Sequence, residues 1–251
     1  MTPLSVVIIT HNEESRIRAA LESASFADEI VVVDSFSTDR TADICREHTA
    51  SVYQEKWRGF SGQKSHAVGL AKNDWVFVLD ADERITPALA SEIKALMENG
   101  PEKAGYFCPR RNHFIGREIR HGGWYPDYSI RLFDRRRGSF GERAVHEAVA
   151  INGEAGYLRN PMLHYTYDSI SDYLVRMDKY SALAAQELQK AGKQSGLIDL
   201  ALRPLLTFLK MYFLKQGFRD GRHGLMLAAL YSFYTFSKYA KLWELGKSTG
   251  R

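Results

Sequence analysis

The chain has 251 residues, of which 45% are hydrophobic, and this is enough for one full domain with an appendage. Its two cysteines, Cys45 and Cys108, lack the spacing of a disulfide framework or a zinc site, which is consistent with a reducing cytosol. The net charge of +4 combines −2 over residues 1–196 with +6 over residues 197–251; this acidic body, without a recognition motif, argues against a nucleic-acid partner.

The first half of the chain alternates apolar runs with helical patterns. We expect strands at residues 4–10, 29–33, 50–53 and 74–79. We expect helices at residues 17–24, from Thr41 onward, and at residues 62–72. Strands that alternate with helices of about ten residues predict an α/β fold, with a parallel sheet covered by helices on both faces.

Polar residues follow three of these strands. They occur in Thr10-His11-Asn12-Glu13-Glu14, in residues 34–39, and in Asp80-Ala81-Asp82. The carboxyl ends of such strands share one edge of the sheet, where open α/β sheets bind ligands. If the extended geometry persists past Leu79, Asp80 and Asp82 point the same way and can hold a hard divalent cation. The alternative is a solvated acidic loop.

These segments together resemble a known family. Residues 6–14 (Val-Val-Ile-Ile-Thr-His-Asn-Glu-Glu), residues 30–39 (Ile-Val-Val-Val-Asp-Ser-Phe-Ser-Thr-Asp) and residues 79–83 (Leu-Asp-Ala-Asp-Glu) are similar to family 2 glycosyltransferases of the GT-A fold. The resemblance covers roughly residues 4–165. Residues 131–133 (Arg-Leu-Phe), residues 145–147 (Val-His-Glu) and a basic, aromatic tail further resemble the bacterial glucosyltransferases of lipopolysaccharide core assembly.

The resemblance implies a Rossmann-like, nucleotide-sugar-binding mixed sheet with a C-terminal helical extension. It also implies a metal-dependent inverting transferase that moves a hexose, glucose from UDP-glucose, to a lipid-linked saccharide such as the lipopolysaccharide inner core. The cofactor would be Mg²⁺ or Mn²⁺. The residues that it implies for the nucleotide sugar are Thr10, Asn12, Glu13, Asp34, Lys64 and Asp80; those for the metal are Asp82, Asp80 and His164. Lys64 could instead be a surface lysine, and His164 an ordinary structural histidine.

An inverting transfer needs a base that takes a proton from the acceptor hydroxyl. By resemblance, Asp127 is the first candidate, although Pro126 stands where the family more often has Glu. Trp124 and Arg131 are expected to contact the acceptor, and Asp127 could alternatively only pair with Arg131 or cap a turn. His146 and Glu147 are the other candidates for the base.

Two basic regions suggest anionic partners. The run at residues 135–137, Arg-Arg-Arg, is either a solvated face or a binding surface for an acceptor that carries phosphates or acidic sugars. Residues 197–251 contain nine Lys/Arg and ten aromatic residues, but no apolar run of the ~20 residues that a membrane span needs. This tail is typical of a helical pair lying in an anionic interface; alternatively, its helices pack on the domain or on a second copy in a homo-oligomer.

We therefore expect a catalytic domain over residues 1–166, with a nucleotide-binding half at 1–100 and an acceptor half at 101–166. Residues 167–251 would form a membrane-associating extension on the cytoplasmic face of the bacterial inner membrane. Residues 4–9 are too short for the apolar region of a signal peptide. A nucleotidyltransferase and a non-catalytic membrane-bound scaffold remain alternatives, although the former should carry a Gly-rich phosphate loop where Glu13 and Glu14 stand.

Overall fold

The structure is a computed structural model that describes residues 2–141 and 149–248. The chain divides into two compact units. The sheet unit lies within residues 1–111 and 127–164, and the helical unit within residues 112–126 and 165–251. The helical unit thus takes in residues 112–126, which the sequence analysis assigned to the catalytic domain.

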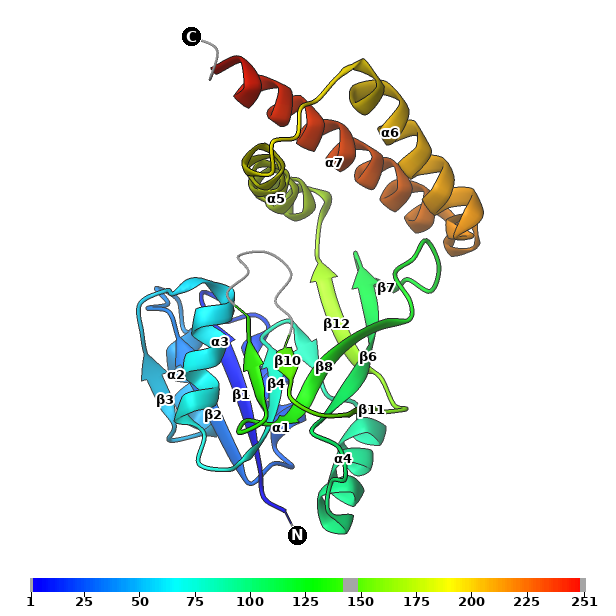
Figure 1. The fold of residues 1–251 in the computed structure, drawn as a ribbon. Helices are drawn as coiled ribbons and strands as arrows, with labels where there is room; N and C mark the ends of the chain where they lie inside the picture. Colours follow the sequence, from blue (N-terminus) through cyan, green and yellow to red (C-terminus); the bar gives the residue numbers. More distant parts are fainter. Residues whose placement is uncertain (1, 142–148, 249–251) are drawn as a thin grey trace. The chain divides into compact units, whose positions relative to one another are not determined.

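The sheet unit contains the alternating elements that the sequence predicts (Figure 1). Its helices are α1 (Ile17–Ala24), α2 (Thr41–His48), α3 (Gly59–Leu70) and α4 (Pro87–Asn99). The strands of the chain are β1 (Leu4–Thr10), β2 (Glu29–Asp34), β3 (Val52–Gln54), β4 (Trp75–Asp80), β5 (Glu83–Arg84), β6 (Gly105–Phe114), β7 (Arg117–Glu118), β8 (Asp127–Asp134), β9 (Gly138–Phe140), β10 (Val149–Ile151), β11 (Ala155–Tyr157) and β12 (Met162–Tyr167).

The main sheet is mixed, with strand order β3-β2-β1-β4-β8-β6-β12-β5. Strands β1 to β4 run parallel to one another, whereas β8 runs antiparallel to both β4 and β6. The parallel half is built from near-continuous apolar runs because helices cover both of its faces. The expected α/β fold with a mixed sheet is therefore confirmed.

Successive side chains of the central strands serve two different cores. Val6 and Ile8 of β1 pack in one cluster with residues of α1, α2 and α4. Val7 and Ile9 pack in a second cluster with Ala67 of α3. This alternation follows from the two-residue period of a strand. The apolar runs stop at the carboxyl ends of β1, β2 and β4, and polar residues follow them at that edge of the sheet.

The helical unit is held together by aromatic side chains. Its helices are α5 (Ile170–Lys190), α6 (Leu197–Leu209), the π-helical turn η1 (Lys210–Leu214), the 3₁₀ turn η2 (Gly217–Asp220) and α7 (Gly221–Ser248). Phe114 is fully buried and makes edge-to-face contacts with Trp124, Tyr167 and Tyr173. Burial raises the pKa of the Tyr173 hydroxyl. Of the aromatic residues in 197–251 that were expected at a surface, Phe208, Tyr212, Tyr231 and Tyr234 pack against this cluster, whereas Phe213, Phe218, Phe233, Phe236 and Trp243 are exposed.

None of the described helices combines the length and the apolar character that crossing a bilayer requires.

A glycine in α7 lets this helix approach η2 closely. A Cβ placed on Gly224 would lie only 1.8 Å from the carbonyl oxygen of Gly217. Gly246, on the same helix α7, has no atom within 4 Å of its ideal Cβ position. The two positions therefore share a helix and differ in the space that surrounds them.

We expect Gly224→Ala to lower the free energy of unfolding by at least about 1–3 kcal/mol, because the backbone of η2 must move away. Gly246→Ala should be neutral or stabilise the chain by about 0.5–1 kcal/mol, since alanine favours the helix. Denaturant titration followed by circular dichroism measures both. Equal effects of the two substitutions would contradict this account of the packing.

Candidate active site

Three strand ends meet at one edge of the sheet. In the strand register, Thr10 pairs with Asp34, and Ile9 pairs with Asp80. Asp34 is fully buried and Thr10 is nearly so, with a hydroxyl that has no hydrogen-bond partner in the structure. The expectation that the β1, β2 and β4 ends deliver polar groups to one edge is met.

The loops after β1 and β2 are hydrogen-bonded to each other. The side-chain oxygen of Asn12 accepts a bond from the Thr38 amide at 2.8 Å, and the Asn12 amide donates to the Ser37 hydroxyl at 2.9 Å. The Glu13 amide donates to the Thr41 hydroxyl at 2.8 Å. Asn12 adopts a positive φ of 54°, a conformation that asparagine tolerates better than most residues. These bonds hold the two loops as one polar platform.

Asp80, at the end of β4, lies between two cations. Lys64 of α3 approaches one carboxylate oxygen at 2.8 Å, and Arg131 of β8 approaches the other at 3.1 Å. Burial alone would raise the pKa of Asp80, but Lys64 and Arg131 outweigh it and hold that pKa below its usual value. Lys64 is itself buried, so the alternative of a surface lysine is wrong.

Glu83 is a second acid in this cluster, and the sequence analysis did not single it out. Its side chain is fully buried and lies 2.5 Å from Arg131. It also accepts a hydrogen bond from the Asp80 amide at 3.0 Å. Burial raises the pKa of Glu83, while Arg131 opposes that rise. Glu83 thus fixes the guanidinium of Arg131 and the backbone of Asp80 together.

Arg110 of β6 extends this cluster to Asp127. Its guanidinium lies 3.6 Å from Glu83 and 2.7 Å from the Asp127 carboxylate. Charges therefore alternate along one connected series, which we call the charge chain: Lys64, Asp80, Arg131, Glu83, Arg110 and Asp127. Asp127 pairs with Arg110, and its expected alternative partner Arg131 faces Asp80 and Glu83 instead. The charge chain connects the end of β4 to the first residue of β8.

Asp82 has a different partner from Asp80. Strand β4 ends at Asp80, and a turn at residues 81–82 precedes β5, so the extended geometry that we expected past Leu79 does not occur. Asp82 instead lies 3.6 Å from the His164 ring. Burial would raise the pKa of Asp82, and the neighbouring His164 ring holds that pKa below the usual value.

The Asp82–His164 pair fits a divalent cation. Within residues 2–141 and 149–248, no group of three or more Asp, Glu, His or Cys side chains converges on one point. A carboxylate and an imidazole are nevertheless suitable ligands, and Mg²⁺ commonly takes one or two carboxylates together with substrate phosphates. The pair therefore suits a metal whose remaining ligands come from a diphosphate. Asp80, already between two cations, is less available as a direct ligand.

Several expected residues lie elsewhere. His146 and Glu147 fall outside the described residues. Trp124 belongs to the helical unit, where its ring is buried against Phe114, so the structure gives its expected contact with an acceptor no direct support. Arg131 is buried as well, and its guanidinium is bonded to carboxylates; an acceptor contact by Arg131 stays a prediction.

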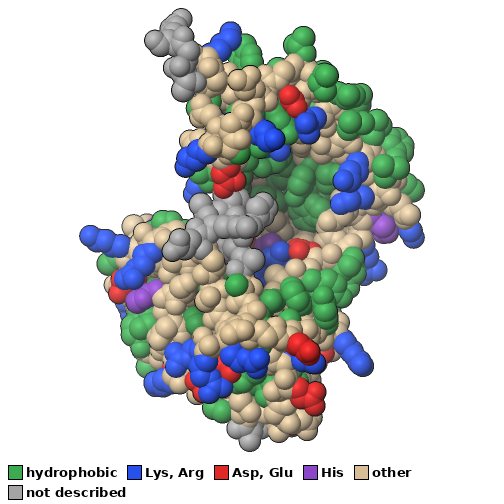
Figure 2. Space-filling view, in the orientation of Figure 1, with side chains coloured by type: hydrophobic (Ala, Val, Ile, Leu, Met, Phe, Trp, Pro, Cys, Tyr) green, Lys and Arg blue, Asp and Glu red, His purple; other side chains and the backbone are tan. Residues whose placement is uncertain are grey.

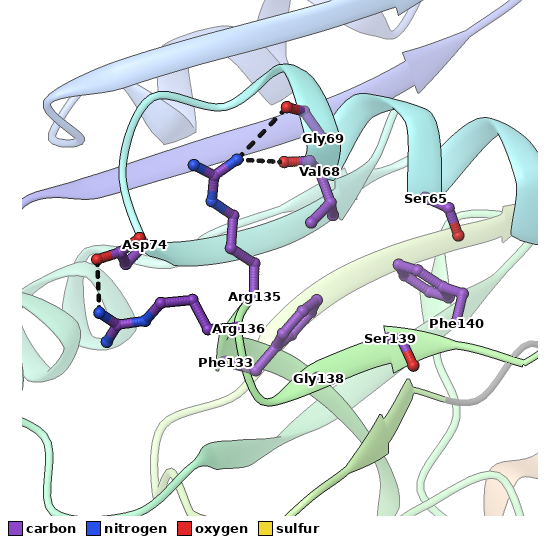
Figure 3. A pocket seen from close by; sticks show the side chains of 10 residues that line it. All are labelled: Ser65, Val68, Gly69, Asp74, Phe133, Arg135, Arg136, Gly138, Ser139 and Phe140. Atoms are coloured by element: carbon purple, nitrogen blue, oxygen red, sulfur yellow. Dashed lines mark hydrogen bonds and ion pairs between the residues drawn. The ribbon is translucent and has the colours of Figure 1, made fainter.

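The arginine run at residues 135–137 lies at the other end of the strands. Asp134 pairs with Trp75, the first residue of β4, whereas Asp80 is the last. Arg135 donates to the carbonyl oxygens of Val68 and Gly69, and Arg136 pairs with Asp74 at 2.9 Å (Figure 3). The arginines therefore do not belong to the charge chain.

A pocket of about 410 Å³ adjoins this run. It is lined by Ser65, Val68, Gly69, Asp74, Phe133, Arg135, Arg136, Gly138, Ser139 and Phe140 (Figure 3). None of the residues expected to bind the nucleotide sugar or the metal lines it. Arg135 and Arg136 thus bond to backbone carbonyl oxygens and to a carboxylate, while Arg136 and Arg137 are exposed; an acceptor contact by this run stays a prediction.

Comparison with known proteins identifies the class of this enzyme. The mixed sheet with its acidic strand ends is that of a GT-A glycosyltransferase. The chain belongs to glycosyl transferase family 2, whose model matches residues 5–162. This family favours sugar transfer over the nucleotidyltransferase and the non-catalytic scaffold that the sequence left open.

Curated relatives extend over nearly the whole chain. The lipopolysaccharide core biosynthesis glycosyltransferase LpsC of Rhizobium meliloti is 31% identical over 249 residues, which are 96% of this chain and 92% of that protein. An uncharacterized glycosyltransferase of Rickettsia bellii is 31% identical over 254 residues, 96% of this chain and 86% of its own length. The predicted resemblance to family 2 and to lipopolysaccharide core glycosyltransferases is confirmed.

Solved structures show weaker similarity. TarS 1–349 of S. aureus in complex with UDP is 16% identical, with a TM-score of 0.49 and coverage of 100% of this chain and 92% of that one. Glucosyl-3-phosphoglycerate synthase of Mycobacterium tuberculosis in complex with Mn²⁺ and UDP-glucose is 21% identical, with a TM-score of 0.38 and coverage of 45% and 44%.

The buried part of the charge chain predicts a measurable coupling. Arg131→Met leaves Glu83 buried with only the more distant Arg110, and we expect it to cost about 3–5 kcal/mol of stability. Glu83→Gln should also destabilise the chain, because it leaves Arg131 with one carboxylate.

The Arg131→Met/Glu83→Gln double variant should be more stable than the sum of the two losses predicts, since neither charge is then left unpaired. Denaturant unfolding of the four proteins measures this. Additive losses would show that the two residues do not act as a pair.

Proposed function

We propose that this chain is a metal-dependent inverting glycosyltransferase that moves glucose from UDP-glucose to a lipid-linked bacterial saccharide such as the lipopolysaccharide inner core. One observation carries the metal-dependent step: the Asp82–His164 pair beside the polar edge where Thr10, Asp34 and Asp80 meet. The similarity to LpsC supports the class of acceptor. The choice of glucose and of UDP rests on the family resemblance.

The charge balance of the site supports a role for a metal. Each cation of the charge chain already faces a carboxylate, so the chain alone does not compensate the charge of an incoming diphosphate. A divalent cation held by Asp82 and His164 would supply that compensation and stabilise the leaving group as its negative charge develops. Lys64 and Arg131 both pair with Asp80. They would therefore keep the end of β4 in place when the donor binds.

The nucleotide would lie on the platform formed by the loops after β1 and β2. Asp34 is held there by Gln54 and by the amide of Ser37 at 3.0 Å, so its carboxylate is fixed in direction. The unpaired Thr10 hydroxyl is a free hydrogen-bonding group at the same edge. Asn12 and Glu13 complete the set that we propose for the base and the ribose.

Asp127 is our proposed base. It is the outermost member of the charge chain, and its side chain is 33% exposed while Glu83 is fully buried. A base must reach the proton of the acceptor hydroxyl, and only an accessible carboxylate can do so. Arg110 contacts both Asp127 and the buried Glu83, and its contact with Glu83 fixes the guanidinium that holds Asp127 in position. Trp124 and Arg131 keep their proposed acceptor roles, and His146 and Glu147 are the alternatives for the base.

We also propose a cellular location and separate roles for the two parts of the chain. Residues 1–166 would form the catalytic domain, with donor binding in 1–100 and acceptor binding in 101–166. Residues 167–251 would hold the enzyme as a peripheral protein on the cytoplasmic face of the inner membrane, where a lipid-linked acceptor presents its sugars. A homo-oligomer is the alternative use of the same helices.

A donor screen with a metal-site variant tests the proposal. Native enzyme with Mn²⁺ or Mg²⁺ should hydrolyse or transfer from UDP-glucose in preference to other UDP-, GDP- and dTDP-sugars. Asp82→Ala should lower that turnover by at least about a hundredfold, because it removes charge stabilisation from the transition state. Asp43→Ala, an exposed carboxylate on α2, is the matched control and should be near native. Near-native activity of Asp82→Ala with metal present would refute the metal assignment.

Asp127→Asn should lower turnover by about 10²–10⁴-fold while donor affinity is retained, since a base acts on the acceptor in the transition state. Steady-state kinetics with UDP-glucose varied at fixed acceptor separate the two quantities. Glu147→Gln and His146→Ala serve as comparisons. A larger loss of turnover in Glu147→Gln would move the base to that residue.

A further inference from the structure

Helix α6 is apolar on two opposite sides. One side packs on α7: Pro204 is buried, its carbonyl accepts a bond from the Ser232 hydroxyl at 2.8 Å, and Thr207 lies 3.3 Å from Thr235. A helix with a single partner needs only this one apolar stripe. The other side of α6 therefore requires a separate explanation.

The second side carries an exposed stripe of large apolar residues, which we call the outer stripe. Its members recur at helical spacing: Ile198, Leu202, Leu205, Leu206 and Leu209 lie on α6, and Phe213 continues the stripe on the following turn η1. Their exposed fractions range from 38% for Leu209 to 69% for Ile198. Single exposed leucines are ordinary, but a contiguous stripe of this kind marks an interaction surface. Figure 2 shows hydrophobic side chains together with Lys and Arg on the surface of the helical unit.

The charges around the outer stripe are almost all positive. The exposed cations near it in sequence are Arg203, Lys210, Lys215, Arg219 and Arg222. The acids of the same segment are already engaged: Asp199 pairs with Arg203 at 2.5 Å. Asp220 is buried and accepts bonds from the His121 ring and amide. A surface of this charge complements an anionic partner and would repel a second copy of itself.

We propose that the outer stripe of α6 is the surface by which this enzyme enters an anionic lipid bilayer, with α6 lying in the plane of the interface. The leucines would reach the acyl boundary, and Lys210, Lys215, Arg219 and Arg222 would contact lipid phosphates. The inference rests on the proposed peripheral location. It narrows the sequence expectation from residues 197–251 as a whole to one stripe, which consists of aliphatic side chains of α6 and Phe213 of η1.

Vesicle sedimentation of the full chain tests this surface. Leu202→Gln/Leu206→Gln changes two exposed positions to a good helix former, and Leu174→Gln/Val175→Gln makes the matched change on the exposed side of α5. Thermal melting establishes that each variant is folded. The native chain should bind vesicles of phosphatidylethanolamine and phosphatidylglycerol more tightly than neutral phosphatidylcholine vesicles.

We expect the α6 variant to partition onto the anionic vesicles at least about tenfold more weakly, and the α5 variant to match the native chain. Equal losses in both variants, or native binding by the α6 variant, would overturn the proposal. So would a native dimer by light scattering that the α6 variant abolishes, since a second copy would then cover the stripe. Transfer to a short soluble acceptor is measured in parallel. If no protein transfers sugar but the difference in vesicle binding persists, the proposed reaction is refuted and the proposed membrane surface is retained.

Discussion

The ion pair between Arg131 and Glu83 is the contact on which the geometry of the site depends. Both side chains are buried, and Glu83 also accepts a hydrogen bond from the Asp80 amide. Two buried charges gain little net stability from each other, because the cost of removing them from water offsets their attraction. The role of such a pair is therefore to position the groups around it more than to add stability. The Arg131–Glu83 pair holds the end of β4 against β8 and fixes the direction of the Asp80 carboxylate.

The two units follow different rules of construction. The sheet unit has near-continuous aliphatic runs on its central strands and gathers the charge chain at one edge of its sheet. The helical unit fills its interior with aromatic rings around Phe114, and it leaves aliphatic residues of α6 outside. Composition suggested aromatic residues at the surface of residues 197–251, and this holds for Phe213, Phe218, Phe233, Phe236 and Trp243 but not for Phe208, Tyr212, Tyr231 and Tyr234. Helical spacing could have separated the two stripes of α6, but it does not tell which one α7 covers.

The sequence predicted the local elements and the shared polar edge well. The apolar runs of β1, β2 and β4 allow only a buried parallel sheet, and parallel strands place their carboxyl ends together. It did not predict Glu83 or Arg110, because their partners come from strands far along the chain. The antiparallel register of β8 with β4 decides that Arg131 reaches Asp80 while residues 135–137 lie at the opposite end. A turn after Asp80 likewise ended the strand geometry that we had expected for Asp82.

The charge chain gives the proposed reaction a physical link between its two halves. In that proposal Asp80 lies on the donor side and Asp127 on the acceptor side; every member of the charge chain between them contacts both of its neighbours. Because Glu83 is shared by Arg131 and Arg110, neither guanidinium can shift without leaving a buried carboxylate partly unpaired, which is costly. The separation between Asp80 and the proposed base Asp127 is therefore set by ion pairs between strands, whereas the proposed metal ligand Asp82 lies on the turn after β4. Such rigidity suits the proposed inverting transfer, in which the leaving diphosphate and the acceptor hydroxyl with its base must lie on opposite sides of the reacting sugar carbon.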